Sequence, residues 1–240
     1  MVISQPATCV HYNETLAEMQ AVMSTENQII DALAAARIVP VVVIDNPDHA
    51  LPLGKALLDG GLDVIEVTYR TAGAQAALTA LKELPELIVG AGTVVRPDQV
   101  DSAVAAGAQF LVSPGLSVEV VQRAQAVGIP ILPGIATPSD IMTALALGLS
   151  TVKFFPAATL GGPSAIKAFS APFPGLRFVP TGGISAASVG DYLAIPAVLA
   201  AGGSWMVDRT LIEAENWAEI TRRTAEAVAL AAPATASIGA

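Results

Sequence analysis

Short apolar runs rich in β-branched residues recur along the chain at intervals of roughly 20 to 26 residues. Each run is followed by a longer segment in which apolar positions return with helical spacing. This alternation predicts repeated β–α units and a parallel sheet. The eight predicted strands centre on Val39–Ile44, Val64–Thr68, Ile88–Ala91, Phe110–Val112, Ile129–Leu132, Thr151–Phe155, Arg177–Val179 and Ala197–Ala200.

The segments between these runs carry residues that typically start and end helices. Proline and small polar side chains suit N-caps and first turns. They predict helix starts at Pro97–Asp98, Ser117, Pro138–Asp140 and Ser185. Glycine suits the left-handed residue that follows a helix, so helices are expected to end at Gly60–Gly61, Gly107, Gly128 and Gly148.

Eight such units in 240 residues predict an α/β fold, a single-domain (β/α)8 TIM barrel with an extra N-terminal helix. An open doubly wound sheet is the structural alternative. The predicted organisation is an N-terminal extension over 1–23, a barrel over 24–231 and a flexible tail over 232–240. Residues 24–36 are expected to form a helix leading into the first strand. The extension is either a short helix packed across the barrel bottom or a mobile segment.

Composition narrows the classes of function. Proline and glycine interrupt every long uncharged run before it reaches about 20 residues, so no membrane span is expected. The net charge of −9 argues against binding to nucleic acid or anionic lipid. The single cysteine, Cys9, rules out an internal disulfide and suits a reducing compartment. No Lys or Arg precedes Arg37, so the basic residues of a targeting segment are missing and the cytoplasm is the expected location.

Lys153 is the residue with the most distinctive setting. The chain has four lysines, and Lys153 is the one that interrupts an apolar strand. Burying an ammonium is costly unless it is paired, neutralised or used. A desolvated lysine loses proton affinity and becomes an amine nucleophile able to attack a ketone or aldehyde. A lysine that snorkels to solvent or closes an internal salt bridge is the alternative.

The second strand places a carboxylate where it can meet Lys153. By the two-residue period, Glu66 and Arg70 share one side of the strand, while Ile65 and Val67 share the other. The apolar side suits packing against helices, so Glu66 is expected to point into the barrel or its mouth. There it would supply the proton transfers that imine chemistry needs. A structural Glu66–Arg70 ion pair is the alternative.

Glycine-rich loops follow the last two predicted strands, at Thr181–Gly183 and Gly202–Ser204. Backbone N–H groups exposed at a helix start in this position form the usual phosphate site of a barrel. A pair of tight turns is the alternative. The strand ends at Gly90–Thr93, Ser113–Gly115 and Pro133–Gly134 are weaker signals: the first offers a hydroxyl, and the other two are expected to be compact loops that shape walls.

Cofactor chemistry finds little support in the sequence. The histidines are His11, in the N-terminal extension, and His49, at the predicted start of a helix. Neither lies at a strand end, where a metal-dependent barrel enzyme would need imidazole ligands, so no metal is expected. The sequence has neither a Rossmann fingerprint nor a Walker motif, so no nucleotide cofactor is expected either.

Seven short blocks together resemble the signature of the 2-keto-3-deoxy-6-phosphogluconate (KDPG) aldolase / 4-hydroxy-2-oxoglutarate (KHG) aldolase family. The resemblance extends from about Ile29 to Ala231, with the blocks in the family's order and spacing. Two features depart from it: Ala158–Leu160, where the family often has an acidic residue and an amide, and the longer N-terminal extension. The blocks are Glu66–Thr71, Gly90–Val94, Ser113–Gly115, Pro133–Ile135, Lys153–Ala157, Pro180–Ile184 and Gly202–Trp205.

The resemblance implies a metal-free class I pyruvate aldolase on a (β/α)8 barrel, usually a homotrimer. It implies that Lys153 forms the Schiff base and that Glu66 is the general acid and base. Arg70 and Thr93 would hold the substrate carboxylate. Pro114 and Phe155 would also contact the substrate, with Phe155 lining the pyruvyl pocket. The phosphate would lie on Gly182, Gly183, Gly203 and Ser204.

The resemblance therefore implies reversible cleavage of KDPG, a small 2-keto acid, to pyruvate and glyceraldehyde 3-phosphate. The enzymatic alternative is the same enamine chemistry on a smaller acid, either 4-hydroxy-2-oxoglutarate cleavage or oxaloacetate decarboxylation. A barrel that only binds a phosphorylated ligand, or that serves in assembly, is the non-enzymatic alternative. It leaves Lys153 and Glu66 without a purpose.

Overall fold

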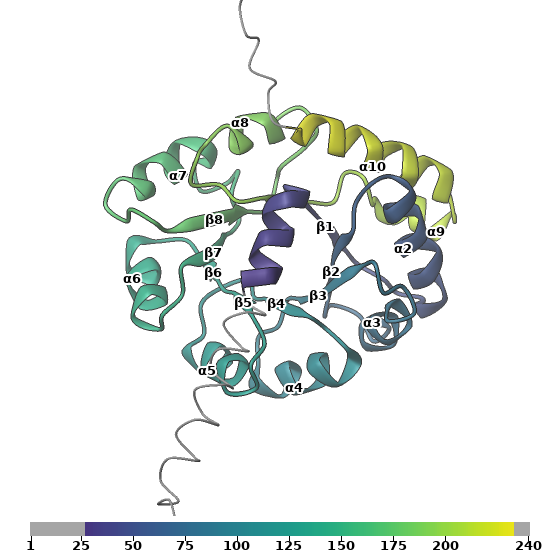
Figure 1. The fold of residues 1–240 in the computed structure, drawn as a ribbon, viewed down its shortest axis with the longest axis horizontal. Helices are drawn as coiled ribbons and strands as arrows, with labels where there is room; N and C mark the ends of the chain where they lie inside the picture. The colour runs from purple at the N-terminus through teal and green to yellow at the C-terminus, as the bar shows by residue number, and fades with distance from the viewer. Residues whose placement is uncertain (1–26, 233–240) are drawn as a thin grey trace, which may run out of the picture.

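The structure, a computed structural model, describes residues 27–232 and has an α/β fold built on parallel strands. Figure 1 shows the strands arranged in a ring, with the helices around its outside. The strands are short and mostly buried. They are β1 (Ile38–Val42), β2 (Val64–Thr68), β3 (Ile88–Gly92), β4 (Phe110–Val112), β5 (Ile131–Leu132), β6 (Gly134–Ile135), β7 (Thr151–Phe154), β8 (Arg177–Pro180) and β9 (Ala201–Gly203).

The strands form two parallel sheets that meet at two seams. One sheet has the order β5-β4-β3-β2-β1-β9 and the other the order β6-β7-β8. At the first seam, β5 and β6 are separated by Pro133 alone; β5 pairs with β4, whereas β6 pairs with β7. At the second seam, isolated parallel bridges join Phe178 to Val198 and Thr181 to Gly202.

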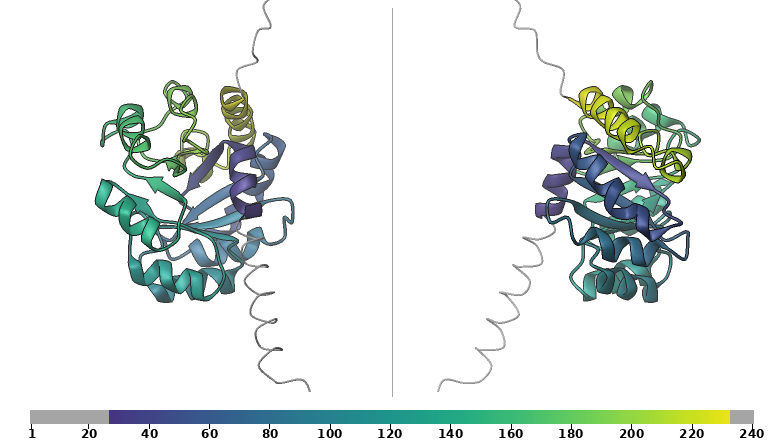
Figure 2. Two further views of the ribbon diagram at one scale, coloured as in Figure 1. Left: turned by 60° about the vertical axis from the view of Figure 1, so that its left-hand side comes forward. Right: turned by 90° about the vertical axis from the view of Figure 1, so that its right-hand side faces the viewer.

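The helices alternate with the strands and cover the outside of the ring (Figures 1 and 2). Residues 27–36 are helical and lie across the centre of the ring in Figure 1, immediately before β1. The remaining helical segments are η1 (Pro47–His49), α2 (Ala50–Asp59), α3 (Ala74–Leu81), α4 (Pro97–Ala106), α5 (Val118–Ala126), α6 (Pro138–Ala146), α7 (Gly162–Ser170), α8 (Val189–Leu193), α9 (Arg209–Glu213) and α10 (Trp217–Ala231).

Two apolar clusters stabilise the fold on the two faces of the strands. The larger cluster lies between the strands and the surrounding helices and includes Ile65 and Val67 of β2. The smaller cluster includes Val64 of β2 together with Ile29 and Leu33 of the helix at 27–36. Alternate residues of β2 therefore face opposite sides, as the two-residue period predicts.

Most strand and helix boundaries agree with the sequence-based prediction. Strands β2 and β4 have the predicted limits, and Ser117 accepts a hydrogen bond from Val120 as the N-cap of α5. The expected glycines also follow helix ends: Gly107 ends α4 with a φ of 97°. The predicted extension over 1–23 and nearly all of the predicted tail lie outside the described residues.

Three predictions about local structure are wrong. The last strand is Ala201–Gly203 rather than Ala197–Ala200, because the residues that pair with β1 are Ala201, Gly202 and Gly203. Ser185 does not begin a helix: its carbonyl accepts from Ser188 and Val189 in a turn, and α8 begins only at Val189. Gly134 belongs to a strand rather than to a loop, since β6 pairs with β7 there.

Candidate active site

Lys153 and Glu66 form a buried ion pair across the ring. Lys153 Nζ lies 3.3 Å from Glu66 Oε1, and the two side chains are only 5% and 4% exposed. The residues belong to β7 and β2, which are not neighbours in either sheet, so the two side chains meet inside the ring. The predicted convergence of the amine and the carboxylate is confirmed by this geometry.

The carboxylate of Glu66 has room because the neighbouring strand carries glycine. Gly92 ends β3 and pairs with Thr68 of β2. A Cβ atom at Gly92 would overlap the carboxyl group of Glu66. The missing side chain therefore allows the carboxylate to extend along β3 toward Lys153. On the other flank, Thr68 is fully buried and its hydroxyl donates to the carbonyl of Val42 at 2.9 Å, which ties β2 to β1.

Arg70 and Thr93 form a second polar pair, just beyond the ends of β2 and β3. Arg70 Nε donates to Thr93 Oγ1 at 3.1 Å. Thr93 has a φ of 60°, in the left-handed region that a β-branched residue rarely adopts. Such strained residues cluster at functional sites. The side chain of Arg70 is exposed, so the alternative of a structural Glu66–Arg70 pair finds no support: Glu66 pairs with Lys153 instead.

A cavity of about 240 Å³ opens beside these pairs at the carboxyl ends of the strands. Phe155 lines the cavity, and its ring centroid lies 5.3 Å from Lys153 Nζ. Arg70 contributes one wall. The cavity is lined by Val41, Val43, Arg70, Phe155, Thr181, Gly182, Gly183, Ile184, Gly202, Gly203 and Ser204.

The two glycine loops meet in this cavity, as the sequence predicts. Gly182 and Gly183 have φ values of 98° and 74°, a conformation that favours glycine. The backbone N–H groups of Gly183 and Ser204 donate to no acceptor within residues 27–232. The predicted helix starts are wrong, however, because α8 begins at Val189 and α9 at Arg209. Any anion here is bound by loop amides rather than by a helix terminus.

Pro114 lies apart from the cavity. Its carbonyl group packs against the backbone of Gly134, where a Cβ atom would overlap it. Gly134 pairs with Lys153 in the β6–β7 ladder, so Pro114 supports the strand next to the one that carries the amine. Ser113 closes the same loop by donating to the carbonyl of Gly115 at 2.8 Å. Six of the ten predicted site residues line the cavity. Lys153, Glu66 and Thr93 adjoin them through the contacts with Phe155 and Arg70 described above, and Pro114 packs on β6.

Five cavity residues were not among the predicted site residues: Val41, Val43, Thr181, Ile184 and Gly202. Thr181 is buried and follows β8 directly, so its place beside the glycine pair was the available signal. Val41 and Val43 belong to an apolar run whose side chains look alike in sequence. Only the closure of β1 against β9 shows which of them reach the cavity.

Tyr69 follows Thr68 but faces the outer layer, where it meets Ser102 of α4 at 3.4 Å. Burial raises the pKa of the Tyr69 phenol, and the hydrogen bond with Ser102 acts in the opposite direction.

Within residues 27–232, no group of three or more His, Cys, Asp or Glu side chains is arranged to hold a metal ion. In the same range, no helix is both long and apolar enough to cross a membrane.

Comparisons with known proteins point to one family. The family model described as "KDPG and KHG aldolase" matches residues 29–223. The KHG/KDPG aldolase of Escherichia coli K12 is 47% identical over 197 residues, which cover 82% of this chain and 92% of that protein.

Two solved structures resemble the chain closely. The KDPG aldolase of Legionella pneumophila, with pyruvate captured as a covalent carbinolamine intermediate, has a TM-score of 0.79 and 44% identity, and the match covers 81% of this chain and 95% of that one. The enzyme of Zymomonas mobilis ZM4 with 3-phosphoglycerate has a TM-score of 0.80 and 42% identity, with 84% and 95% covered.

Proposed function

The chain belongs to the KDPG and KHG aldolase family, and on that premise we propose that it is a class I aldolase that cleaves 2-keto-3-deoxy-6-phosphogluconate reversibly to pyruvate and glyceraldehyde 3-phosphate. The observation that carries the proposal is the buried Lys153–Glu66 pair beside a cavity edged by loop amides. A covalent pyruvate carbinolamine in the Legionella pneumophila relative supports imine chemistry.

The reaction begins at Lys153. Its amine, after giving up a proton, attacks the C2 ketone of the substrate to form a carbinolamine. Loss of water, with proton transfers by Glu66, gives an iminium ion. The iminium then accepts the electron pair of the C3–C4 bond as that bond breaks and the C4 hydroxyl loses its proton. Glyceraldehyde 3-phosphate leaves, and an enamine of pyruvate remains on Lys153.

Glu66 closes the cycle. Protonation of the enamine carbon gives the pyruvate iminium, and water then hydrolyses it to release pyruvate and the free amine. A carboxylate 3.3 Å from the amine is within reach of each of these proton transfers, directly or through one water. Burial of both groups supports this role, because a low-dielectric setting strengthens the interaction of the carboxylate with the cationic iminium.

The remaining residues bind the two ends of the substrate. We propose that Arg70 and Thr93 hold the C1 carboxylate, since an arginine and a hydroxyl donate hydrogen bonds suited to it. Phe155 covers the pyruvyl carbons beside Lys153. Pro114 contributes by supporting β6. At the other end, Ser204 and the amides around Gly182, Gly183 and Gly203 bind the phosphate; these residues are called the phosphate cradle below.

We also infer that the two sheets close into one (β/α)8 barrel over residues 24–231. The break at Pro133, on either side of which β5 and β6 pair with different neighbours, supports closure at one seam. The bridges Phe178–Val198 and Thr181–Gly202 support it at the other. A homotrimer and a cytoplasmic location remain predictions. The exposed Met142 and Leu145, one turn apart on α6, supply apolar surface that suits an interface between copies.

Steady-state cleavage of a panel of 2-keto acids by the wild-type protein and Ser204→Ala tests the substrate. We expect Ser204→Ala to lower kcat/KM for KDPG by about tenfold or more, because a hydrogen bond to a charged group is worth roughly 1.5 to 3 kcal/mol. Cleavage of 4-hydroxy-2-oxoglutarate, which has no phosphate, should hardly change. Equal losses on both substrates would contradict a phosphate contact, and a wild-type preference for the five-carbon acid or oxaloacetate would contradict KDPG as the main substrate.

A further inference from the structure

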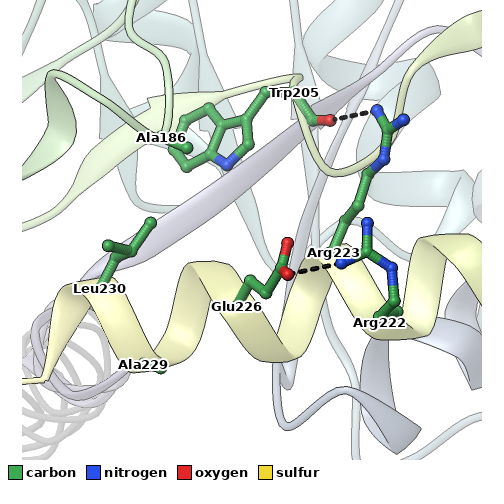
Figure 3. A pocket seen from close by; sticks show the side chains of 7 residues that line it. All are labelled: Ala186, Trp205, Arg222, Arg223, Glu226, Ala229 and Leu230. Atoms are coloured by element: carbon green, nitrogen blue, oxygen red, sulfur yellow. Dashed lines mark hydrogen bonds and ion pairs between the residues drawn. The ribbon is translucent and has the colours of Figure 1, made fainter.

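A second cleft, of about 630 Å³, lies behind the phosphate cradle and is separate from the cavity described above. Figure 3 shows α10 along one side of the cleft and Trp205 and Ala186 on the other. Ala186 follows the loop of Gly182 and Gly183, and Trp205 follows Gly203 and Ser204. A residue that follows each loop of the cradle therefore lines this cleft.

Trp205 connects the cleft to the cradle. A Cβ atom at Gly203 would overlap the six-membered ring of Trp205, so the indole lies directly against the backbone of Gly203. Gly203 and Ser204 line the substrate cavity, whereas Trp205 lines the cleft. A shift of Trp205 would displace the backbone that presents Ser204 to the phosphate.

Arg223 of α10 holds this segment from the side of the cleft. Its Nη1 donates to the carbonyl of Trp205 at 3.3 Å, and its Nε donates to Glu219 Oε1 at 2.8 Å (Figure 3 draws the first bond). The guanidinium is thus fixed at both ends. Arginine hydrogen bonds, from Arg222 first and then Arg223, lower the pKa of Glu219 to about 2, so this carboxylate stays ionised at neutral pH.

The helix that carries Arg223 is itself firmly anchored. Ile220 and Ala227 of α10 are fully buried in the outer apolar cluster. Asn216 caps the helix by accepting from the backbone N–H of Glu219 at 3.3 Å. Arg223 therefore transmits the position of a packed helix to the Trp205 carbonyl.

We propose that Arg223 is a positioning residue for phosphate recognition: by holding the Trp205 carbonyl, it fixes the Gly203–Ser204 backbone in the orientation that binds the phosphate of the substrate. The inference rests on the proposed function. Arg223 contacts neither the cavity nor the reacting atoms, so it acts only through Trp205. The cleft itself is not suited to binding an anion, because Glu219 and Glu226 pair with the two arginines there.

Arg222 provides a matched control. It is the adjacent residue on the same helix and also pairs with Glu219, as well as with Glu226. Within residues 27–232 it donates to no carbonyl of the cradle loops. Arg222→Met and Arg223→Met thus remove the same charge, and each removes an arginine partner of Glu219. Arg222→Met also removes the partner of Glu226, and only Arg223→Met releases the Trp205 carbonyl.

The kinetic test compares the two variants on KDPG and on 4-hydroxy-2-oxoglutarate. Arg223→Met should lower kcat/KM for KDPG by about tenfold, the effect of one charge-assisted hydrogen bond, mainly through KM. Its kcat/KM for the unphosphorylated acid should stay within about twofold of wild type, and Arg222→Met should stay within about twofold on both. Arg223→Lys, which keeps a donor, should recover part of the loss.

A binding test uses Trp205 as the reporter. The sequence contains two tryptophans, so Trp217→Phe leaves Trp205 as the single indole. Titration of this background with inorganic phosphate should change the Trp205 fluorescence. Adding Arg223→Met should raise the apparent Kd for phosphate by about tenfold, whereas adding Arg222→Met should leave it near the background value.

Two results would overturn the proposal. Equal losses on both substrates for Arg223→Met would mean that Arg223 stabilises the fold. Matching behaviour of Arg222→Met and Arg223→Met would mean that the shared charge matters rather than the Trp205 contact. A wild-type protein that fails to cleave KDPG, or that inorganic phosphate does not inhibit, would instead contradict the proposed function and, with it, the cradle.

Discussion

Replacing Glu66 by Gln separates the catalytic role of this residue from a structural one. The amide has the size of the carboxylate and keeps an oxygen that can accept a hydrogen bond from Lys153. In the wild-type protein, Lys153 Nζ lies 3.3 Å from Glu66 Oε1. It loses the basicity that proton transfer requires. We expect kcat for KDPG cleavage to fall by a factor of about 10² to 10⁴, the usual contribution of a general acid or base.

The same change has a limited cost in stability. Both side chains are nearly inaccessible, at 5% and 4% exposure, and removing one partner of such a pair entirely costs about 3 to 5 kcal/mol. Because Gln keeps a hydrogen bond, we expect a smaller loss of about 1 to 3 kcal/mol in the free energy of unfolding. For a domain of this size, that loss lowers the melting temperature by about 2 to 12 °C.

The assay couples pyruvate formation to NADH oxidation by lactate dehydrogenase at 25 °C, and circular dichroism follows thermal unfolding. Proton–deuterium exchange of the pyruvate methyl group, read by NMR, measures the enamine step without the aldehyde. Glu66→Gln should slow both the cleavage and the exchange. A variant with near-normal kcat and a much lower melting temperature would rule out the catalytic role and assign Glu66 a purely structural one.

Two further substitutions test other parts of the structure. Gly92→Ala places a methyl group against the carboxyl group of Glu66 and should lower kcat by up to about 10²-fold, the effect of misplacing a reacting group by about 1 Å. In the control, Gly90→Ala, the methyl group meets the Phe110 ring, so this variant should mainly lower the melting temperature. Equal kcat values for the two variants would contradict a role of Gly92 in positioning Glu66. Thr224→Val removes a fully buried hydroxyl that has no hydrogen-bond partner within the described residues, so it should raise the free energy of unfolding by about 1 kcal/mol. A lower melting temperature for this variant would mean that the hydroxyl has a partner.

The two-residue alternation of side chains along a strand, together with the order of the strands, was enough to predict that Lys153 and Glu66 meet. Lys153 and Glu66 face the interior because each lies on the side of its strand opposite the residues that pack on helices. The two glycine loops converge because the carboxyl ends of parallel strands meet at one edge. These features depend on local pattern and on the order of strands, which a sequence carries directly.

The errors arise where tertiary contacts override local pattern. The apolar run at Ala197–Ala200 looks like a strand, yet the strand is Ala201–Gly203, whose small residues leave room for Thr181 and Trp205. Ser185 has the chemistry of an N-cap but closes a turn instead. The contact of Arg223 with Trp205 joins a helix to a distant loop, and no sequence pattern predicts such a contact.

Lys153 is expected to form an imine with the substrate, and reductive trapping detects that covalent bond. The protein is mixed with pyruvate, reduced with borohydride, digested and analysed by mass spectrometry. We predict one stable adduct, on the peptide that contains Lys153, and neither adduct nor turnover in Lys153→Ala. An adduct on Lys55, Lys82 or Lys167 instead, or a Lys153→Ala variant that still cleaves KDPG at the wild-type rate, would contradict the account.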